Sequence, residues 1–158
     1  MNLSVIQQEL LKTMQGLQAH IPCIKILEDF PVDKINDRVT ELPYTAWEIV
    51  EHMRLAQRDI LDYIVKPDYK ESHWPDEYWP EKGKEATAEQ WHNTVKQFKA
   101  DMQSLEKIIL DPNSDLTAPL EHNPMHSIFR ELLIIGNHNS YHSGQLLVIM
   151  RILKIYTT

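Results

Sequence analysis

The histidines of this chain are the residues most able to do chemistry. Eight occur among its 158 residues, and His138 and His142 are four positions apart in a long apolar segment. On a helix, that spacing is about 40° of rotation, so both rings leave from one face. Two imidazoles so placed can bind one metal ion. Two core histidines hydrogen-bonded to carbonyl groups would show the same spacing, so the pair alone leaves both interpretations open.

A third histidine, His52, lies at the edge of the apolar stripe of another expected helix and faces inward by the same periodicity. Three nitrogens from two helices would leave coordination positions open for water or substrate, as in catalytic zinc sites. Nickel or iron would also accept three imidazoles. We therefore predict a divalent metal site at His52, His138 and His142, with zinc or nickel favoured and iron or manganese as alternatives. The alternative role of His52 is a polar edge residue bonded to solvent.

Two better-known metal signatures are absent from the sequence. Asn139 follows His138, where a metallopeptidase of the His-Glu-x-x-His type has its general base. A pair of Glu-x-x-His motifs, which di-iron bundles require, does not occur either. Spacing alone therefore identifies no general base.

Four polar residues are candidates to orient the histidine rings. Glu131 and Gln145 lie on the same helical face as His138 and His142, and each could fix a ring tautomer. Glu48 is one turn before His52, although a capping box already gives it a role. Tyr141 flanks the pair and could be a proton donor, with simple packing as the alternative.

Four segments with helical periodicity must position these residues. The first has an apolar stripe over residues 3–17, and the next two begin at the capping boxes Thr45-Ala-Trp-Glu48 and Thr87-Ala-Glu-Gln90. The fourth is expected to begin after Asn123-Pro124 as N-cap and first residue, and its apolar residues on nearly every side predict burial all round. The pattern predicts an all-α four-helix bundle.

Two long connections join these helices, over residues 20–43 and 67–86. The second is rich in aromatic residues, including Trp74 and Trp79, and could form either a lid on the bundle or the wall of a pocket. His122 and His126 precede the fourth helix. They could line a pocket mouth or be solvated loop histidines.

Composition limits the class of protein. The length suits a single domain spanning residues 1–158. The net charge of −7, without a basic face, argues against nucleic acid as a partner. Cys23 is the only cysteine, the N-terminal segment lacks the pattern of a signal peptide, and no apolar run is long enough to cross a membrane. We therefore expect a cytoplasmic location and no membrane association.

Three segments make the chain resemble the DinB-like superfamily of metal-binding four-helix bundles, which includes the YfiT-type thiol transferases. They are Pro43-Tyr-Thr-Ala-Trp-Glu-Ile-Val-Glu-His52, Trp74-Pro-Asp-Glu-Tyr-Trp-Pro80, and Arg130-Glu131 followed by His138-Asn-Ser-Tyr-His-Ser-Gly-Gln145. The resemblance implies that the same three histidines bind a divalent metal. It also implies a homodimer and transfer of small thiols such as bacillithiol or mycothiol. Asn137 stands where the family often has Asp, and residues 154–156 replace a common Gly and Trp.

Three functions are consistent with these features. The favoured one is a metal-dependent enzyme that activates a small thiol, as a thiol transferase, or water, as a hydrolase. The second is a non-catalytic stress protein that binds a metal or small ligand. The third is a structural bundle whose histidines are satisfied core groups.

Overall fold

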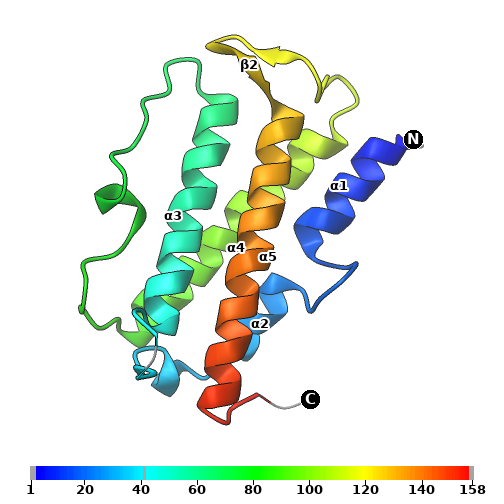
Figure 1. Cartoon of the computed structure of the whole chain (residues 1–158). Coiled ribbons are helices and arrows are strands. Elements are labelled where there is room, and N and C mark those ends of the chain that lie inside the picture. Colours follow the sequence, from blue (N-terminus) through cyan, green and yellow to red (C-terminus); the bar gives the residue numbers. More distant parts are fainter. Residues whose placement is uncertain (1–2, 41, 157–158) are drawn as a thin grey trace.

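A computed structural model describes residues 3–40 and 42–156, and four long helices account for most of them (Figure 1). Figure 1 shows α3 beside α5, with α4 behind them and α1 on the far side of α5. Contacts of α4 with α3 and α1, and of α5 with the same two helices, close the bundle. The prediction of an all-α bundle is confirmed. The four helices are α1 (Val5–Gln15), α3 (Ala46–Val65), α4 (Ala88–Leu110) and α5 (Ile128–Ile152).

Capping boxes fix where three of these helices begin. Thr45 and Thr87 are the N-caps of α3 and α4, as the sequence predicts, and Ser4 makes the same reciprocal bonds at α1. The first helix ends sooner than its apolar stripe suggests. Gly16 takes a left-handed φ of 68° and terminates α1.

The predicted start of the fourth helix is wrong. Residues Asn123–Ser127 form strand β2, which pairs antiparallel with β1 (Pro119–Leu120). The Asn123 carboxamide accepts a hydrogen bond from the Met125 backbone, a local turn that competes with helix capping. Ser127 is the N-cap instead, and α5 begins at Ile128.

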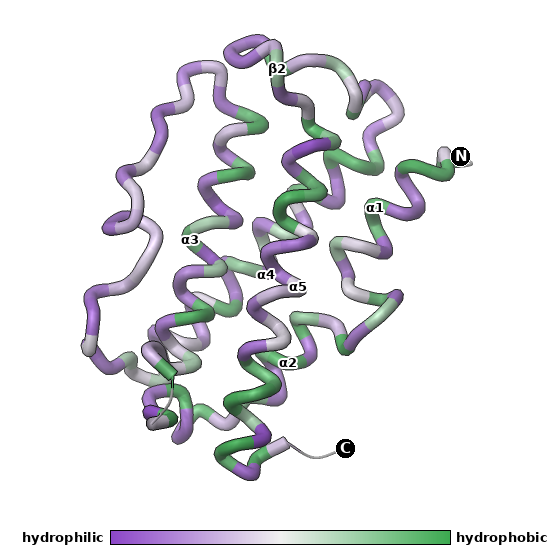
Figure 2. Tube along the Cα trace, in the orientation of Figure 1, coloured by the Kyte–Doolittle hydropathy of each residue, from purple (hydrophilic) through white to green (hydrophobic). Residues whose placement is uncertain are grey.

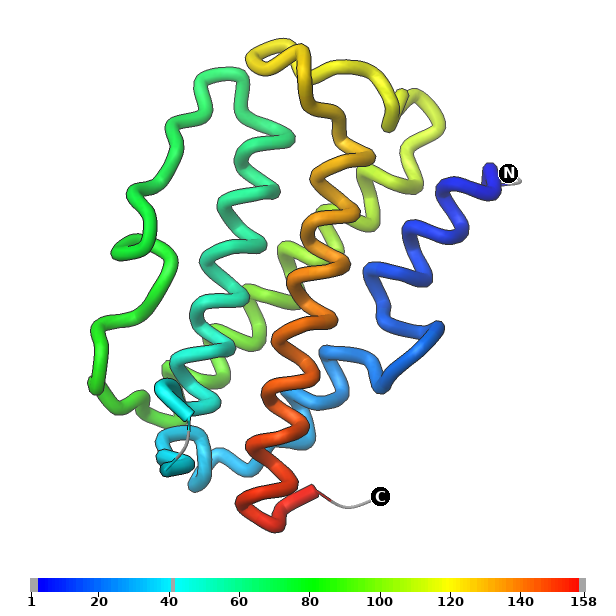
Figure 3. Tube along the Cα trace, in the orientation of Figure 1, coloured from blue at the N-terminus to red at the C-terminus, as the bar shows by residue number. Residues whose placement is uncertain are grey.

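Both long connections contain local structure that the sequence pattern did not reveal. The first holds the short helix α2 (Cys23–Asp29) and a 3₁₀ turn, η1 (Val32–Lys34). The second, over residues 66–87, contains the 3₁₀ turn η2 (Asp76–Tyr78) and runs along the outside of α3, as the tube in Figure 3 shows.

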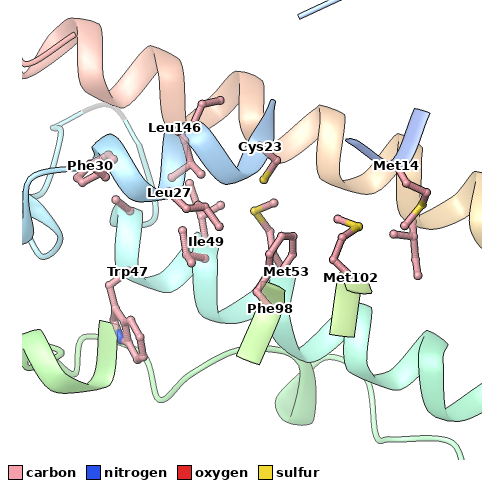
Figure 4. Close-up of a cluster of buried hydrophobic side chains, with 14 of the residues drawn as sticks. Met14, Cys23, Leu27, Phe30, Trp47, Ile49, Met53, Phe98, Met102 and Leu146 are labelled. Atoms are coloured by element: carbon pink, nitrogen blue, oxygen red, sulfur yellow. The ribbon is translucent and has the colours of Figure 1, made fainter. Parts of the chain in front are cut away.

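The hydrophobic core lies between the helices, where side chains from α2, α3, α4 and α5 meet. Figure 4 shows Cys23, Met53, Phe98 and Leu146 directed into this layer. The predicted seam of α4, including Trp91, Phe98 and Leu105, is buried. Apolar stripes of this kind hold a bundle together mainly by burial of hydrophobic area.

Helix α5 is not buried all round, and this corrects the sequence-based expectation. Figure 2 shows that hydrophobic residues recur throughout α5. Several large ones nevertheless remain exposed, because the bundle covers only part of the helix: Leu133, Ile134, Tyr141, Val148 and Ile152. No helix in the described parts of the chain has the length and apolar character needed to cross a bilayer.

The contact between α1 and α5 depends on a glycine, which gives a first prediction. A Cβ on Gly136 would lie 2.7 Å from Thr13 Cγ2, whereas a Cβ on Gly144 of the same helix would meet nothing within 4 Å. Gly144→Ala should stabilise the protein by up to about 1 kcal/mol through helix propensity. Gly136→Ala should lose that gain to overpacking of about 1–3 kcal/mol. Urea denaturation of both variants checks this, and equal gains would contradict the close contact.

Candidate metal centre

Three histidines from two adjacent helices converge at one point. His52 comes from α3, and His138 and His142 come from consecutive turns of α5. One ring nitrogen of each lies within 4.8 Å of the other two. His52 Nε2 and His138 Nε2 are 3.1 Å apart. The structure thus brings together the three residues that the sequence singled out.

The spacing of these nitrogens fits a shared ion. Two nitrogens bound to zinc at 2.0–2.1 Å each are separated by roughly 2.9–3.4 Å at bond angles of about 90–109°. The 3.1 Å between the His52 and His138 nitrogens lies within that range. Three neutral imidazoles are a ligand set suited to zinc, nickel or iron. This arrangement could hold a metal ion.

His52 is held in one orientation by the connection between α3 and α4. Its Nδ1 lies 2.7 Å from the Tyr78 carbonyl oxygen, which can only accept a hydrogen bond. Nδ1 therefore carries the proton, and the lone pair of Nε2 points toward the other histidines. Trp79 stacks on the same ring, with centroids 4.0 Å apart and planes 3° from parallel.

His142 is held by a side-chain relay. Its Nδ1 lies 2.6 Å from Gln145 Oε1, and Gln145 Nε2 donates to the Tyr44 hydroxyl at 2.6 Å. The amide oxygen accepts the Nδ1 proton, which leaves Nε2 available as a ligand. The sequence proposed Gln145 for this role but gave no signal for Tyr44, because Tyr44 precedes α3 and lies outside any helical periodicity.

Burial keeps these rings neutral. Removal from water, together with the neighbouring His142 and His52, lowers the pKa of His138 to about 4. Desolvation likewise lowers the pKa of His142 to about 4. Burial also lowers the pKa of His52, against the opposing effect of the Tyr78 carbonyl. Neutral imidazole is the form that binds metal, so the three side chains are in the form able to bind an ion at neutral pH.

The two glutamates proposed as ring partners lie elsewhere. Glu48 completes the capping box of α3 and also accepts bonds from Gly83 N and Arg38. Burial raises the pKa of Glu48, but these backbone and arginine contacts outweigh it and the pKa is lowered. Glu131 pairs with Arg130 at 2.5 Å, near the start of α5. The seven-residue spacing put Glu131 on the correct face but two turns away along the axis.

His122 and His126 belong to a separate network with Glu131. His126 Nδ1 lies 2.7 Å from the Tyr63 hydroxyl and 3.7 Å from Glu131 Oε1. The His122 ring packs edge-on against Tyr63, with centroids 4.7 Å apart. These contacts fasten the β1–β2 hairpin to α3.

A cavity of about 440 Å³ opens over the three histidines. Tyr141, the remaining candidate, is 65% exposed and packs edge-on against His142 at the wall of this cavity. The aromatic connection supplies further wall residues, as one of the two sequence interpretations anticipated. The complete lining is Tyr44, His52, Ala56, Trp74, Tyr78, Trp79, His138, Tyr141, His142 and Gln145.

Asp59 fastens this connection to α3. Its two carboxylate oxygens accept hydrogen bonds from the hydroxyls of Tyr69 at 2.9 Å and Tyr78 at 2.7 Å. Desolvation, followed by the Asp59 carboxylate, raises the pKa of both phenols. The backbone of Tyr78 is thereby fixed where its carbonyl meets His52. No sequence motif marked Asp59.

Comparison with known proteins identifies the class of this bundle. A family model of the DinB superfamily matches residues 23–146, which include all three histidines. The chain belongs to the DinB superfamily, and the resemblance drawn from the sequence is confirmed. No curated protein and no solved structure matches the chain significantly.

The lowered histidine pKa values predict a pH-dependent stability. The ordinary pKa is 6.5 and the folded value is about 4 for His138 and His142. Between these pH values, the unfolded chain binds protons that the folded histidines do not. The free energy of unfolding of metal-free protein should therefore fall as pH drops from about 6.5 to about 4.

Denaturant titrations across this pH range test the prediction. The His138→Gln/His142→Gln protein should show a shallower decline, because neither group then titrates. A control with the exposed His92→Gln should keep the full decline. If the free energy of unfolding of the double variant fell with pH as steeply as that of wild-type protein, the lowered pKa values of His138 and His142 would be contradicted.

Proposed function

We propose that the protein is a divalent-metal-dependent enzyme whose ion is held by His52, His138 and His142. The observation that carries this proposal is the convergence of three neutral imidazoles, with one nitrogen of each within 4.8 Å of the others. Zinc or nickel is the favoured ion, with iron or manganese as alternatives. The substrate is a small molecule, since the cavity holds about 440 Å³.

The proposed reaction is activation of a small thiol for transfer, or of water for hydrolysis. When bound, a divalent ion with three imidazole ligands leaves open positions and lowers the pKa of a thiol or water molecule there. The residues that line the cavity within the described chain include no carboxylate and no lysine. No side chain there is an evident general base, so the proposal relies on the lowered pKa of the nucleophile.

The protein's own groups would keep the ligand nitrogens in place during the reaction. The Tyr78 carbonyl and the Gln145 amide hold the Nδ1 protons of His52 and His142. Trp79 covers the face of the His52 ring and shields it from water. Rings fixed in advance need little rearrangement when the site binds an ion.

Metal content of tag-free protein tests the site. Wild-type protein should retain a divalent ion through dialysis, as measured by elemental analysis. Removal of any one of the three rings should weaken the affinity for the ion by more than the roughly 10–100-fold that is typical when a hydrogen-bond partner of a metal ligand is lost. The variants are His52→Ala, His138→Ala and His142→Ala. His92→Ala is the matched control, because His92 is exposed on α4. Unchanged metal content in any of the three site variants would contradict the assignment.

Turnover assays on the metal-loaded protein distinguish thiol transfer, hydrolysis and a non-catalytic binding role. Thiol transfer consumes both a thiol and an electrophile, whereas hydrolysis proceeds without thiol. Either activity should disappear in His142→Ala and persist in His92→Ala. Metal binding without turnover across both panels would favour the alternative, a non-catalytic metal-binding or ligand-binding stress protein.

We also propose that the protein forms a homodimer through α5. Ile134, Tyr141, Val148 and Ile152 are exposed and recur at intervals of seven and four residues, which places them on one helical face. An exposed apolar face of this kind is typical of subunit interfaces. We further propose that the chain forms a single domain and acts in the cytoplasm, because its one cysteine, Cys23, fits a reducing compartment. The net charge of −7 argues against a nucleic-acid partner.

Light scattering coupled to gel filtration tests the dimer. Wild-type protein should elute with twice the chain mass, and Val148→Glu should elute as a monomer, because a charge in the interface would be desolvated. Val65→Glu is the matched control, since Val65 is similarly exposed at the end of α3. A monomeric wild-type protein at high concentration would contradict the proposal.

A further inference from the structure

The cavity above the histidines is lined mainly by aromatic side chains. Five of its ten wall residues are aromatic, and none carries a formal charge when the histidines are neutral. Its volume of about 440 Å³ falls within the roughly 300–1,000 Å³ of small-molecule sites. The wall of this cavity therefore offers a ligand aromatic surface and no charged partner. The aromatic wall residues are Tyr44, Trp74, Tyr78, Trp79 and Tyr141.

The lining of the cavity contains no lysine or arginine that could pair with an acidic group on a ligand. The Asp59 carboxylate lies behind Tyr78 and is bonded to its hydroxyl at 2.7 Å. The buried Glu48 lines a small neighbouring recess with Tyr44 and Trp79, and Lys82 lines the same recess outside the cavity. The guanidinium of Arg38 is already paired with Glu48 at 3.1 Å. A carboxylate on the body of a ligand would therefore lose water without gaining a cationic partner in the cavity wall.

The exposed aromatic rings provide contact area for a flat apolar group. Trp79 has one face occupied by His52, so it acts as a fixed wall. Trp74 lines the cavity and is 64% exposed. It packs on Tyr78, with centroids 5.5 Å apart, and meets His52 edge-on. Its remaining surface is available to a ligand that reaches the histidines.

One polar group is placed to recognise a ligand. Gln145 Nε2 donates to the Tyr44 oxygen, so the Tyr44 hydroxyl acts there as an acceptor. Its own proton has no acceptor among the described residues, and Tyr44 lines the cavity. That proton can be donated to a neutral acceptor such as an ether, hydroxyl or carbonyl oxygen.

We propose that this cavity binds the uncharged aromatic part of a small molecule, with Trp74 providing the contact surface and Tyr44 donating one hydrogen bond. This binding mode deepens the proposed function. It rests on that function in one respect only, which is that a thiol or other head group of the same ligand would reach the histidines. The preferred thiol is then a neutral aromatic one, and thiols that carry several carboxylates are poor ligands.

Ligand-observed NMR titrations of metal-free protein test the aromatic site without relying on the metal. Benzyl alcohol should bind at millimolar concentration. Trp74→Ala should weaken binding about tenfold, and Trp74→Phe should retain it, because the ring is kept. Tyr44→Phe should weaken benzyl alcohol about fivefold but leave toluene unchanged, as expected for loss of one hydrogen bond. Leu17→Ala, in the exposed turn that follows α1, is the control.

Competition on metal-loaded protein tests the choice of thiol. Phenylmethanethiol should bind at least tenfold more tightly than mercaptosuccinate, which carries two carboxylates. Equal or tighter binding of mercaptosuccinate would overturn this inference and leave the metal site intact. Absence of benzyl alcohol binding, or unchanged affinity in Trp74→Ala, would also overturn it. Aromatic binding by a protein that retains no metal would instead refute the proposed function alone.

Discussion

The need to satisfy two buried imidazoles and one half-buried imidazole is the constraint on which the site depends. A ring taken out of water must have both nitrogens accounted for. His52 and His142 each have Nδ1 bonded to a group from the surrounding wall, at 2.7 and 2.6 Å. His52 Nε2 then faces His138 Nε2 at 3.1 Å, and one ring nitrogen of each histidine lies within 4.8 Å of the other two. Desolvation keeps the rings unprotonated, so the same burial that is unfavourable for a charged histidine leaves neutral imidazoles, the form able to bind a metal ion.

The connection between α3 and α4 is a structural part of this site. Its aromatic residues do not simply cover the end of the bundle. The Asp59 carboxylate on α3 holds two tyrosine hydroxyls, and one of these tyrosines presents the carbonyl that orients His52. Trp79, the next residue, stacks on the same ring. The connection between α3 and α4 therefore has a fixed position, because hydrogen bonds hold both its tyrosine side chains and its backbone.

Helix α5 combines three separate roles along its length. Its N-terminal turn carries Glu131 and Arg130, which join His126 and the hairpin in a polar network. Its middle supplies two of the three converging histidines. Its exposed apolar residues form a further face. This division explains why α5 is apolar on most sides without being fully buried: one side meets the bundle, and the other is available for contacts outside it.

The sequence by itself determined the elements whose signals are local. Helical periodicity and the capping boxes at Thr45 and Thr87 located α3 and α4. The four-residue spacing of His138 and His142, with the inward position of His52, identified the three residues that converge. Only the tertiary structure decided the remainder. The roles of Tyr44, Asp59 and the Tyr78 carbonyl arise from contacts 101, 10 to 19 and 26 residues apart. The physical reason is that periodicity records which face of a helix is buried, whereas the depth of a residue along that helix, and the partner of a backbone carbonyl, are set by how distant segments pack.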